Sequence, residues 1–566
     1  MRTAFSKFKL ILYIFIFIAI FNSSNAKVSE YNYNAKNISN YFSGLISFND
    51  INYKNSEKFF KKLDNFENSS SQYSSKLIYS LISLGKYNDV YRYSKKLEKK
   101  NLTNFESNLF MGLYEFKAKN YLKAQIYFNK LENNFEHALI FDILKTTLNS
   151  WVKISQTKSE KSIQAIISPH PSYDNIISIQ NAFAYCFIDS SKTSKEFMKI
   201  INNKEANYSR YHFFFSNYLM NKNQKNEAVK IINSASNQYP GNLLINQFKK
   251  SLNNEEKNYT KFNCKNSADI IGEILYVFAN ALSSQENYKL SNFYINLSKF
   301  LNPNFKSFDT LLAENFLILK KNEDAKNIYK KISLLGSVYK WYSAKKIASI
   351  IDDEKERRSI AFLSKVYNEI SPRVYDTFDF ANFLRVKEDY KKSIKLYSEL
   401  LSKINVSNKL YPKVLERRGM AYERSNQWDL AEKDLLLSLK LVPKEPYVMN
   451  YLAYSWVEKN TNIEEALKML REANNLRKND GYITDSLGWA LYKLKNFSEA
   501  KKYLERAIML MPRDPIVNDH FADCLWMNNN KIQARYYWKN TLNFDDVDEE
   551  LKKNIEKKLL FGLQNI

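Results

Sequence analysis

Residues 487–512, LGWALYKLKNFSEAKKYLERAIMLMP, have the spacing of two helices that pack against each other. Gly488 and Ala500 stand twelve positions apart, where two crossing helices leave little room for side chains. Leu491 and Leu504 lie on the helical faces that meet. Pro512 cannot continue a helix and therefore marks the end of the second one.

The same spacing recurs on both sides of this stretch, with a period of 34 or 35 residues. The equivalents of Gly488, Leu491, Ala500 and Leu504 are Gly419, Tyr422, Ala431 and Leu435, then Ala453, Trp456, Ala466 and Leu470, and finally Ala522, Leu525, Ala534 and Trp538. Weaker copies begin at Gly112, Ser216, Ala279, Ala313 and Ala381. Consecutive units in phase predict a tandem array of helix pairs.

This spacing resembles the tetratricopeptide repeat, whose 34-residue unit consists of two antiparallel helices. The resemblance implies an all-α fold, in which tandem helix-turn-helix repeats form a right-handed α-α superhelix, or solenoid. Ten Gly and ten Pro among 566 residues agree with it, because an all-β chain of this length needs many more turn residues. Such an array grows without one enlarging core, since each repeat packs only on its neighbours.

The quality of the match divides the sequence into segments. We expect a signal peptide at 1–26, N-terminal repeats at 27–140, degenerate helical repeats at 141–265, further repeats at 266–370, well-matched repeats at 371–545 and a capping helix at 546–566. A helix break at Pro169 lies inside the degenerate segment. Leu551, Ile555 and Leu559 share one face of the final helix, for which a membrane-surface helix is the alternative.

The first 26 residues have the three parts of an export signal. Arg2, Lys7 and Lys9 precede twelve apolar residues at 10–21, and small residues end at Ala26. We expect cleavage after Ala26 and an exported protein of the periplasm or cell envelope, with an uncleaved anchor as the alternative. No cysteine lies near this site, which excludes lipid attachment there.

The formal net charge of +25 is compatible with nucleic acid or an anionic surface as a partner. Basic residues are spread along the whole chain, however. The abundance of Asn, Lys, Ile, Tyr and Phe, which have A+T-rich codons, indicates that a drift in composition accounts for the positive charge. Export argues against nucleic acid and leaves peripheral contact with an anionic membrane or cell wall as an alternative role. Cys186, Cys264 and Cys524 are too few for a disulfide framework, although one pair can form.

No motif typical of catalysis or metal binding stands out. The four histidines, His137, His170, His212 and His520, are not at metal-ligand spacing from one another or from cysteine. No glycine-rich phosphate loop or nucleophile elbow occurs either. We therefore expect a non-enzymatic protein without cofactor or metal, in which His520 is a surface or helix-packing residue. The enzyme alternative is a site built from His170, Cys186 and His212.

The resemblance also implies a binding groove. In this family the second, fifth, ninth and twelfth positions of each first helix point inward. These positions are counted with Gly488, or its equivalent in another unit, as the eighth. The predicted protein-binding residues are Tyr447, Asn450, Tyr454, Tyr482, Asp485, Trp489, Tyr492, Asp519, Asp523 and Trp526, with Lys413, Glu416, Met420 and Glu423 in the preceding unit. Aromatic residues are favoured at binding hot spots, and the alternative is that some pack between repeats. Some members of the family bind the C-terminal carboxylate of a partner with inward Lys, Arg and Asn residues. We do not expect that set in this chain.

A narrower resemblance covers roughly residues 375–545. The stretches DSLGW at 485–489, PRDP at 512–515 and DH at 519–520 resemble the C-terminal repeats of large bacterial envelope proteins. Some of those are outer-membrane lipoproteins that deliver substrates to a carboxyl-terminal processing protease, and this chain departs from them in lacking the lipoprotein cysteine. The resemblance implies a scaffold or adaptor that binds other proteins, such as an envelope protease or an outer-membrane assembly component.

Overall fold

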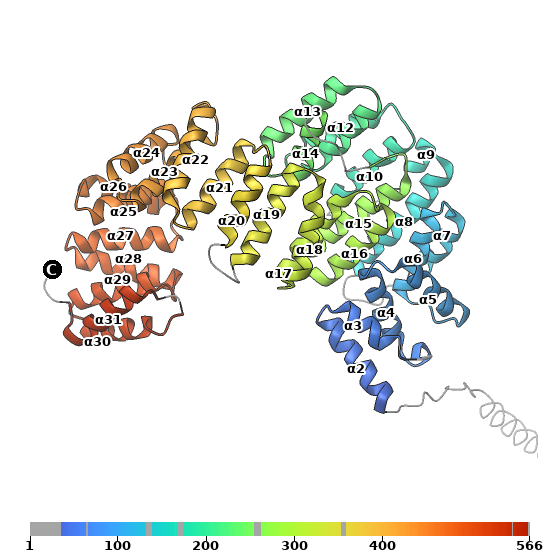
Figure 1. Cartoon of the computed structure of the whole chain (residues 1–566), viewed down its shortest axis with the longest axis horizontal. Helices are drawn as coiled ribbons and strands as arrows, with labels where there is room; N and C mark the ends of the chain where they lie inside the picture. Colours follow the sequence, from blue (N-terminus) through green and yellow to red (C-terminus); the bar gives the residue numbers. More distant parts are fainter. Residues whose placement is uncertain are drawn as a thin grey trace, which may run out of the picture. The chain divides into compact units, whose positions relative to one another are not determined.

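The computed structural model describes residues 35–63, 66–131, 138–164, 166, 174–253, 262–352, 358–545 and 547–563 (Figure 1). In these ranges the chain forms α-helices, a few short 3₁₀ turns and no β-strand. The predicted all-α fold of tandem helix pairs is confirmed. The expected signal peptide at 1–26 and the break at Pro169 lie outside the described residues. None of the described helices combines the length and hydropathy needed to cross a membrane.

The helices belong to two compact units, residues 1–370 and 371–566. Unit 1 contains α2 (Ala35–Asn49), α3 (Tyr53–Phe60), α4 (Ser71–Ser83), α5 (Tyr87–Lys99), α6 (Phe105–Lys117), α7 (Tyr121–Asn129), α8 (Ala138–Thr157), α9 (Glu160–Ile163), α10 (Asp174–Phe187), α11 (Thr193–Asn202), α12 (Tyr211–Asn221), α13 (Lys225–Gln238), α14 (Leu243–Leu252), α15 (Ser267–Ser284), α16 (Tyr288–Leu301), α17 (Asp309–Ile318), α18 (Asn322–Ile332), α19 (Ser337–Asp352) and α20 (Arg358–Glu369).

Unit 2 is a regular series of helix pairs followed by one further helix. It contains α21 (Val374–Val386), α22 (Tyr390–Lys403), α23 (Tyr411–Arg424), α24 (Trp428–Leu441), α25 (Pro446–Glu458), α26 (Ile463–Leu476), α27 (Gly481–Lys493), α28 (Phe497–Leu510), α29 (Pro515–Met527), α30 (Lys531–Thr541) and α31 (Glu549–Phe561). Helices α27 and α28 correspond to the stretch that begins at Leu487.

Small residues let the two helices of a pair approach closely. A Cβ atom at Gly488 of α27 would lie only 2.6 Å from Cγ of Leu504 on α28. The same contact sixteen positions apart occurs between Gly419 and Leu435, between Gly112 and Phe128, and between Gly44 and Phe60. The last of these pairs identifies α2 and α3 as a repeat unit that the sequence analysis did not recognise.

The ends of these helices are also encoded locally. The Asp480 side chain accepts a hydrogen bond from the backbone N–H of Ile483 at 3.2 Å and caps α27. Pro446 and Pro515 occupy the first positions of α25 and α29, where their missing N–H is not needed. These signals explain why the repeat boundaries follow the sequence closely.

The helices of unit 1 pack into a closed arrangement. The Tyr79 ring of α4 stacks on Phe293 of α16, with centroids 4.8 Å apart, and Tyr87 Oη donates to the Asn296 carbonyl at 2.9 Å. Figure 1 shows α4 and α6 beside α15 and α16. The inward positions counted from Gly112 include Leu109, which is fully buried. The inner face of these repeats is therefore filled by the chain itself.

The predicted degenerate segment forms ordinary helices, α8 to α14, where it is described. A disulfide joins Cys186 of α10 to Cys264, with their Cα atoms 5.8 Å apart, and Cys524 is free and buried. The Nδ1 atom of His212 lies 3.1 Å from the Ser209 carbonyl oxygen. The enzyme alternative loses its thiol to the disulfide, and His170 lies outside the described residues. Among the described side chains, no group of three His, Cys, Asp or Glu residues could hold a metal ion.

Candidate protein-binding groove

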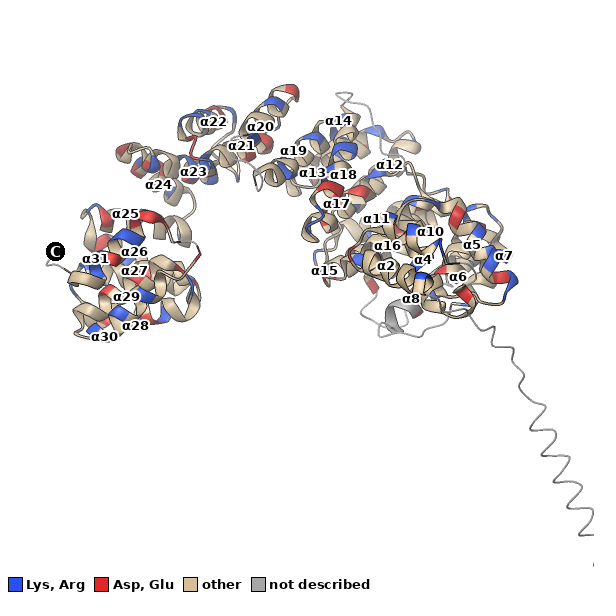
Figure 2. Cartoon of the chain, turned by 60° about the horizontal axis from the view of Figure 1, so that its bottom comes forward, with Lys and Arg blue, Asp and Glu red and all other residues tan. Residues whose placement is uncertain are grey.

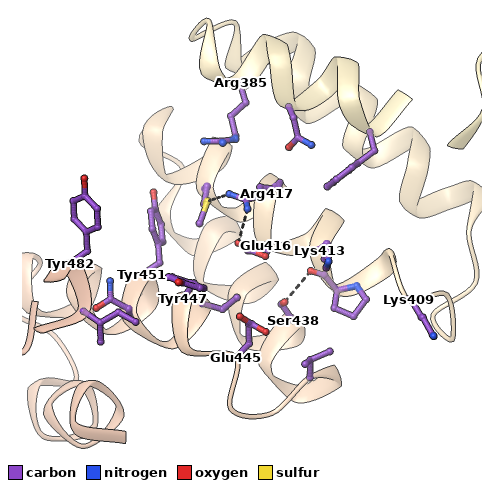
Figure 3. Close-up of a pocket in the computed structure, with 18 residues that line it drawn as sticks. Arg385, Lys409, Lys413, Glu416, Arg417, Ser438, Glu445, Tyr447, Tyr451 and Tyr482 are labelled. Carbon is purple, nitrogen blue, oxygen red and sulfur yellow. Dashed lines mark hydrogen bonds and ion pairs between the residues drawn. The ribbon is translucent and has the colours of Figure 1, made fainter. Parts of the chain in front are cut away.

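A pocket of about 910 Å³ opens in unit 2 among the first helices of successive pairs (Figure 3). Its walls come from α21, α23, α25 and the start of α27, with α24 contributing one side. The inward positions of the first helices supply half of the lining residues: Phe378, Asn382, Arg385, Lys413, Glu416, Met420, Tyr447, Asn450 and Tyr482. The repeat spacing therefore places these side chains around one cavity.

The predicted inward residues begin at α23 and leave out α21, which forms one wall of this pocket. The three residues that α21 contributes follow from Ala381 by the same count of inward positions. The expectation that an inward set of Lys, Arg and Asn is absent was wrong, because Lys413, Arg385 and Asn450 line one cavity. Extending the count to the weaker repeat at Ala381 would have found the missing members.

The pocket carries more cations than anions. Its basic residues are Arg385, Lys409, Lys413 and Arg417, and its acidic residues are Glu416 and Glu445. Burial raises the pKa of Glu416, an effect that the neighbouring Arg417 guanidinium, 3.5 Å away, opposes. Figure 3 shows Arg385 of α21 and Arg417 of α23 facing the same space. This balance favours a bound group with negative charge.

Two polar atoms in the pocket lack hydrogen-bond partners. The Nε atom of Arg385 and the Oδ1 atom of Asn450 are buried, and neither has a partner within the described structure. Buried polar groups in folded proteins nearly always have such partners. Tyr447 and Tyr482 are 47% and 61% exposed beside them. The pocket thus offers two aromatic surfaces to a bound molecule, whereas these two polar atoms are themselves buried.

A second cluster joins α27 to α29. The Trp489 ring stacks on His520 with centroids 3.9 Å apart, and on Tyr492 at 4.7 Å. Trp489 Nε1 donates to Glu458 at 2.7 Å, and Nδ1 of His520 lies 2.9 Å from Oδ2 of Asp485. His520 is buried here, as expected of a packing histidine.

The environment of His520 makes the stability of unit 2 depend on pH. Burial lowers the pKa of His520, but the carboxylates of Asp485, Asp519 and Asp523 together outweigh this effect, so that the pKa lies above the ordinary value of 6.5. The resulting stabilisation is complete below pH 6.5 and is lost as the pH rises through the folded-state pKa. Titration of this one proton changes the free energy of unfolding by at most about 1.4 kcal/mol per pH unit.

We therefore expect the free energy of unfolding of wild-type protein to fall more steeply above pH 6.5 than that of the His520→Gln variant. Urea titrations of both chains between about pH 6 and 8.5 measure this difference. Parallel pH profiles for the two chains would show that the Asp485 contact does not shift the histidine.

The ten predicted groove residues divide into two groups. Tyr447, Asn450 and Tyr482 line the open pocket. Tyr454 and Trp489 are half-buried, whereas Asp485, Tyr492, Asp519 and Asp523 are buried. Trp526 lies against Gly562, which follows α31. The predicted residues nearest the end of the array therefore pack between repeats, as the alternative prediction has it, and do not line an open groove.

Comparison with known proteins now identifies the repeat. The family model described as "Tetratricopeptide repeat" matches residues 485–514. The chain contains tetratricopeptide repeats. A TPR repeat-containing protein of Pseudomonas aeruginosa is 32% identical over 88 residues, which are 15% of each chain. The match thus spans far less than two thirds of that relative.

Solved structures of tetratricopeptide repeat proteins overlay about a third of the chain. A thermophilic TPR protein of Thermus thermophilus aligns over 33% of this chain and 100% of its own, with 15% identity and a TM-score of 0.30. PilF of Pseudomonas aeruginosa aligns over 33% and 85%, with 16% identity and a TM-score of 0.28. MamA of Desulfovibrio magneticus aligns over 32% and 96%, with 14% identity and a TM-score of 0.27.

Proposed function

We propose that this protein is a non-enzymatic scaffold or adaptor of the bacterial cell envelope, which binds a partner protein in the groove of unit 2. The binding site is the pocket among α21, α23, α25 and α27. The observation that supports it most strongly is that inward positions of four first helices meet there, with exposed aromatics and cations. An envelope protease or an outer-membrane assembly component is the kind of partner proposed.

The contrast between the two units supports this choice of site. In unit 1 the inner face of the repeats is packed against α15 and α16. In unit 2 the pocket is open, and its excess of basic residues suits a partner segment that carries carboxylates. Exposed Tyr residues add contact area at a low entropic cost. These properties fit a polypeptide ligand.

The disulfide supports the proposed export. Disulfides persist in oxidising compartments such as the bacterial periplasm and are rare in the cytosol. Cys186 and Cys264 are both buried and bonded to each other. Together with the apolar run at 10–21, this pairing favours a location outside the cytoplasm.

Association with an anionic membrane or cell wall through the basic surface is the alternative role. Figure 2 shows Lys and Arg scattered among Asp and Glu on the helices of both units. Mixed charges of this kind produce a weaker long-range field than a patch of one sign. The surface therefore gives the membrane alternative less support than the pocket gives protein binding.

Changing the pocket should release the partner without unfolding the chain. We expect the double variant Tyr482→Ala with Lys413→Glu to recover at least about tenfold less partner in affinity purification from the crosslinked envelope. Both side chains are exposed, so the circular dichroism spectrum should stay unchanged.

The matched control is Tyr536→Ala with Lys433→Glu, which alters exposed residues of α30 and α24 that do not line the pocket. Equal recovery by the two double variants would refute the assignment of the pocket. Recovery of lipid or wall material in place of protein, decreasing with salt, would favour the alternative role.

A further inference from the structure

The helix α31 lies on positions that the repeat spacing assigns to the groove. Counting from Ala522, the inward positions of α29 include 519, 523 and 526. The Nζ atom of Lys558 lies between 2.7 and 2.9 Å from all four carboxylate oxygens of Asp519 and Asp523. The Trp526 ring lies against Gly562, where a Cβ atom would collide with it. Helix α31 and the residue after it therefore cover these three positions.

The surface beneath α31 requires a cation. Asp519 and Asp523 are only 7% and 4% exposed, and the Trp538 Nε1 donates to Asp523 at 3.0 Å. Burial raises the pKa of Asp523, as does the Asp519 carboxylate, and Lys558 opposes both. Removing one partner of a buried ion pair leaves an uncompensated charge. His520 also lowers the pKa of Asp523, but an occupant that buries both carboxylates as α31 does must replace the Lys558 charge with an ammonium or a guanidinium group.

Helix α31 itself has few buried side chains. Within this helix Ile555 is the one fully buried side chain, while Leu560 and Phe561 are 73% and 66% exposed. Segments with few buried side chains open locally at low free energy. Because α31 is tethered to α30, it competes at a high effective concentration with any external ligand.

We propose that α31 is a resident ligand of the acidic end of the groove, and that a lysine-bearing amphipathic helix of a partner protein takes its place. The resident helix shows the chemistry that this surface accepts. Leu551, Ile555 and Leu559 recur every fourth position on one face, and Lys558 reaches the acid pair beside them. This site is distinct from the pocket at Tyr482 and does not depend on what binds there.

A labelled peptide of residues 547–563 tests the proposal on the full chain. Wild-type protein should bind the peptide weakly, because its own α31 competes. The Lys558→Gln chain should bind it at least about tenfold more tightly, since its resident helix has lost the ammonium. The matched control is Lys557→Gln, which changes an exposed lysine next in sequence and should behave like wild type.

Equal affinity of the Lys557→Gln and Lys558→Gln chains for the peptide would overturn the proposal. So would unchanged binding of a peptide that itself carries Lys558→Gln. A Lys558→Gln chain that dimerises by exchanging α31 would assign the site to self-association instead of a partner protein.

A measurement on the wild-type chain tests the proposal even if the variant misfolds. Hydrogen exchange should show the α31 amides opening faster than those of α29, by at least about tenfold. Equal protection of the two helices would mean that α31 is an integral part of the repeat core, and the proposal would fail.

Discussion

Reducing the disulfide should lower the free energy of unfolding of unit 1 by about 4 kcal/mol, because the bond closes a loop across 78 residues. The closed loop restricts the unfolded chain far more than it restricts the folded one. Phe262, two residues before Cys264, is buried and its ring centroid lies 4.5 Å from that of Phe214. Reduction therefore also releases a segment that completes an aromatic cluster.

Denaturant titrations of the wild-type chain with and without reductant measure this loss. The double variant Cys186→Ser with Cys264→Ser should have the lower free energy of unfolding without reductant, and adding reductant should not change it. The control Cys524→Ser removes the free thiol and should keep the response to reductant. A wild-type midpoint that does not change on reduction would mean that the disulfide contributes nothing to stability.

Breaking the ion pair between Arg210 and Glu273 should cost about 3–5 kcal/mol, because it strands a buried charge. Arg210 donates from Nε and Nη2 to the two carboxylate oxygens of Glu273, at 2.7 and 2.9 Å. Glu273 is fully buried, and the guanidinium also lies 4.3 Å from the Tyr276 ring centroid. In Glu273→Gln the guanidinium keeps its charge and loses its counterion.

A double-mutant cycle separates the pair from the packing around it. Arg210→Met combined with Glu273→Leu removes both charges and should be less destabilising than Glu273→Leu alone, which leaves the guanidinium without its counterion. Urea unfolding of the four chains gives the coupling free energy. If the double variant were as unstable as the sum of the single variants, the two charges would act independently.

The fold could be predicted from the sequence because the helix pairs depend on small residues at fixed spacing. Gly488 and Leu504 meet as the sixteen-residue offset indicates, and Gly419 meets Leu435 in the same way. The unit at Gly44 carried the same signal, with Phe60 sixteen residues later, and was missed because it was not aligned with the stronger repeats.

The long-range contacts could not be predicted in this way. The hydrogen bond from Tyr87 to Asn296 spans 209 residues and leaves no periodic trace in the sequence. The amphipathic pattern of α31 indicated which face is apolar, but not that Lys558 would pair with Asp519. The candidate site was therefore predicted only in part. The inward count found Tyr447, Asn450 and Tyr482 of the pocket, whereas α31 and Gly562 cover the predicted residues Asp519, Asp523 and Trp526.

The most direct test of protein binding in the groove of unit 2 is site-specific photocrosslinking in the native envelope. A photoreactive phenylalanine analogue at Tyr482 lies in the pocket, and the same analogue at Tyr536, 65% exposed on α30, serves as the control. If a protein binds in this pocket, position 482 should give a discrete protein adduct that is absent from position 536 and is lost with Arg385→Glu. No adduct at 482, or identical adducts at both positions, would contradict it.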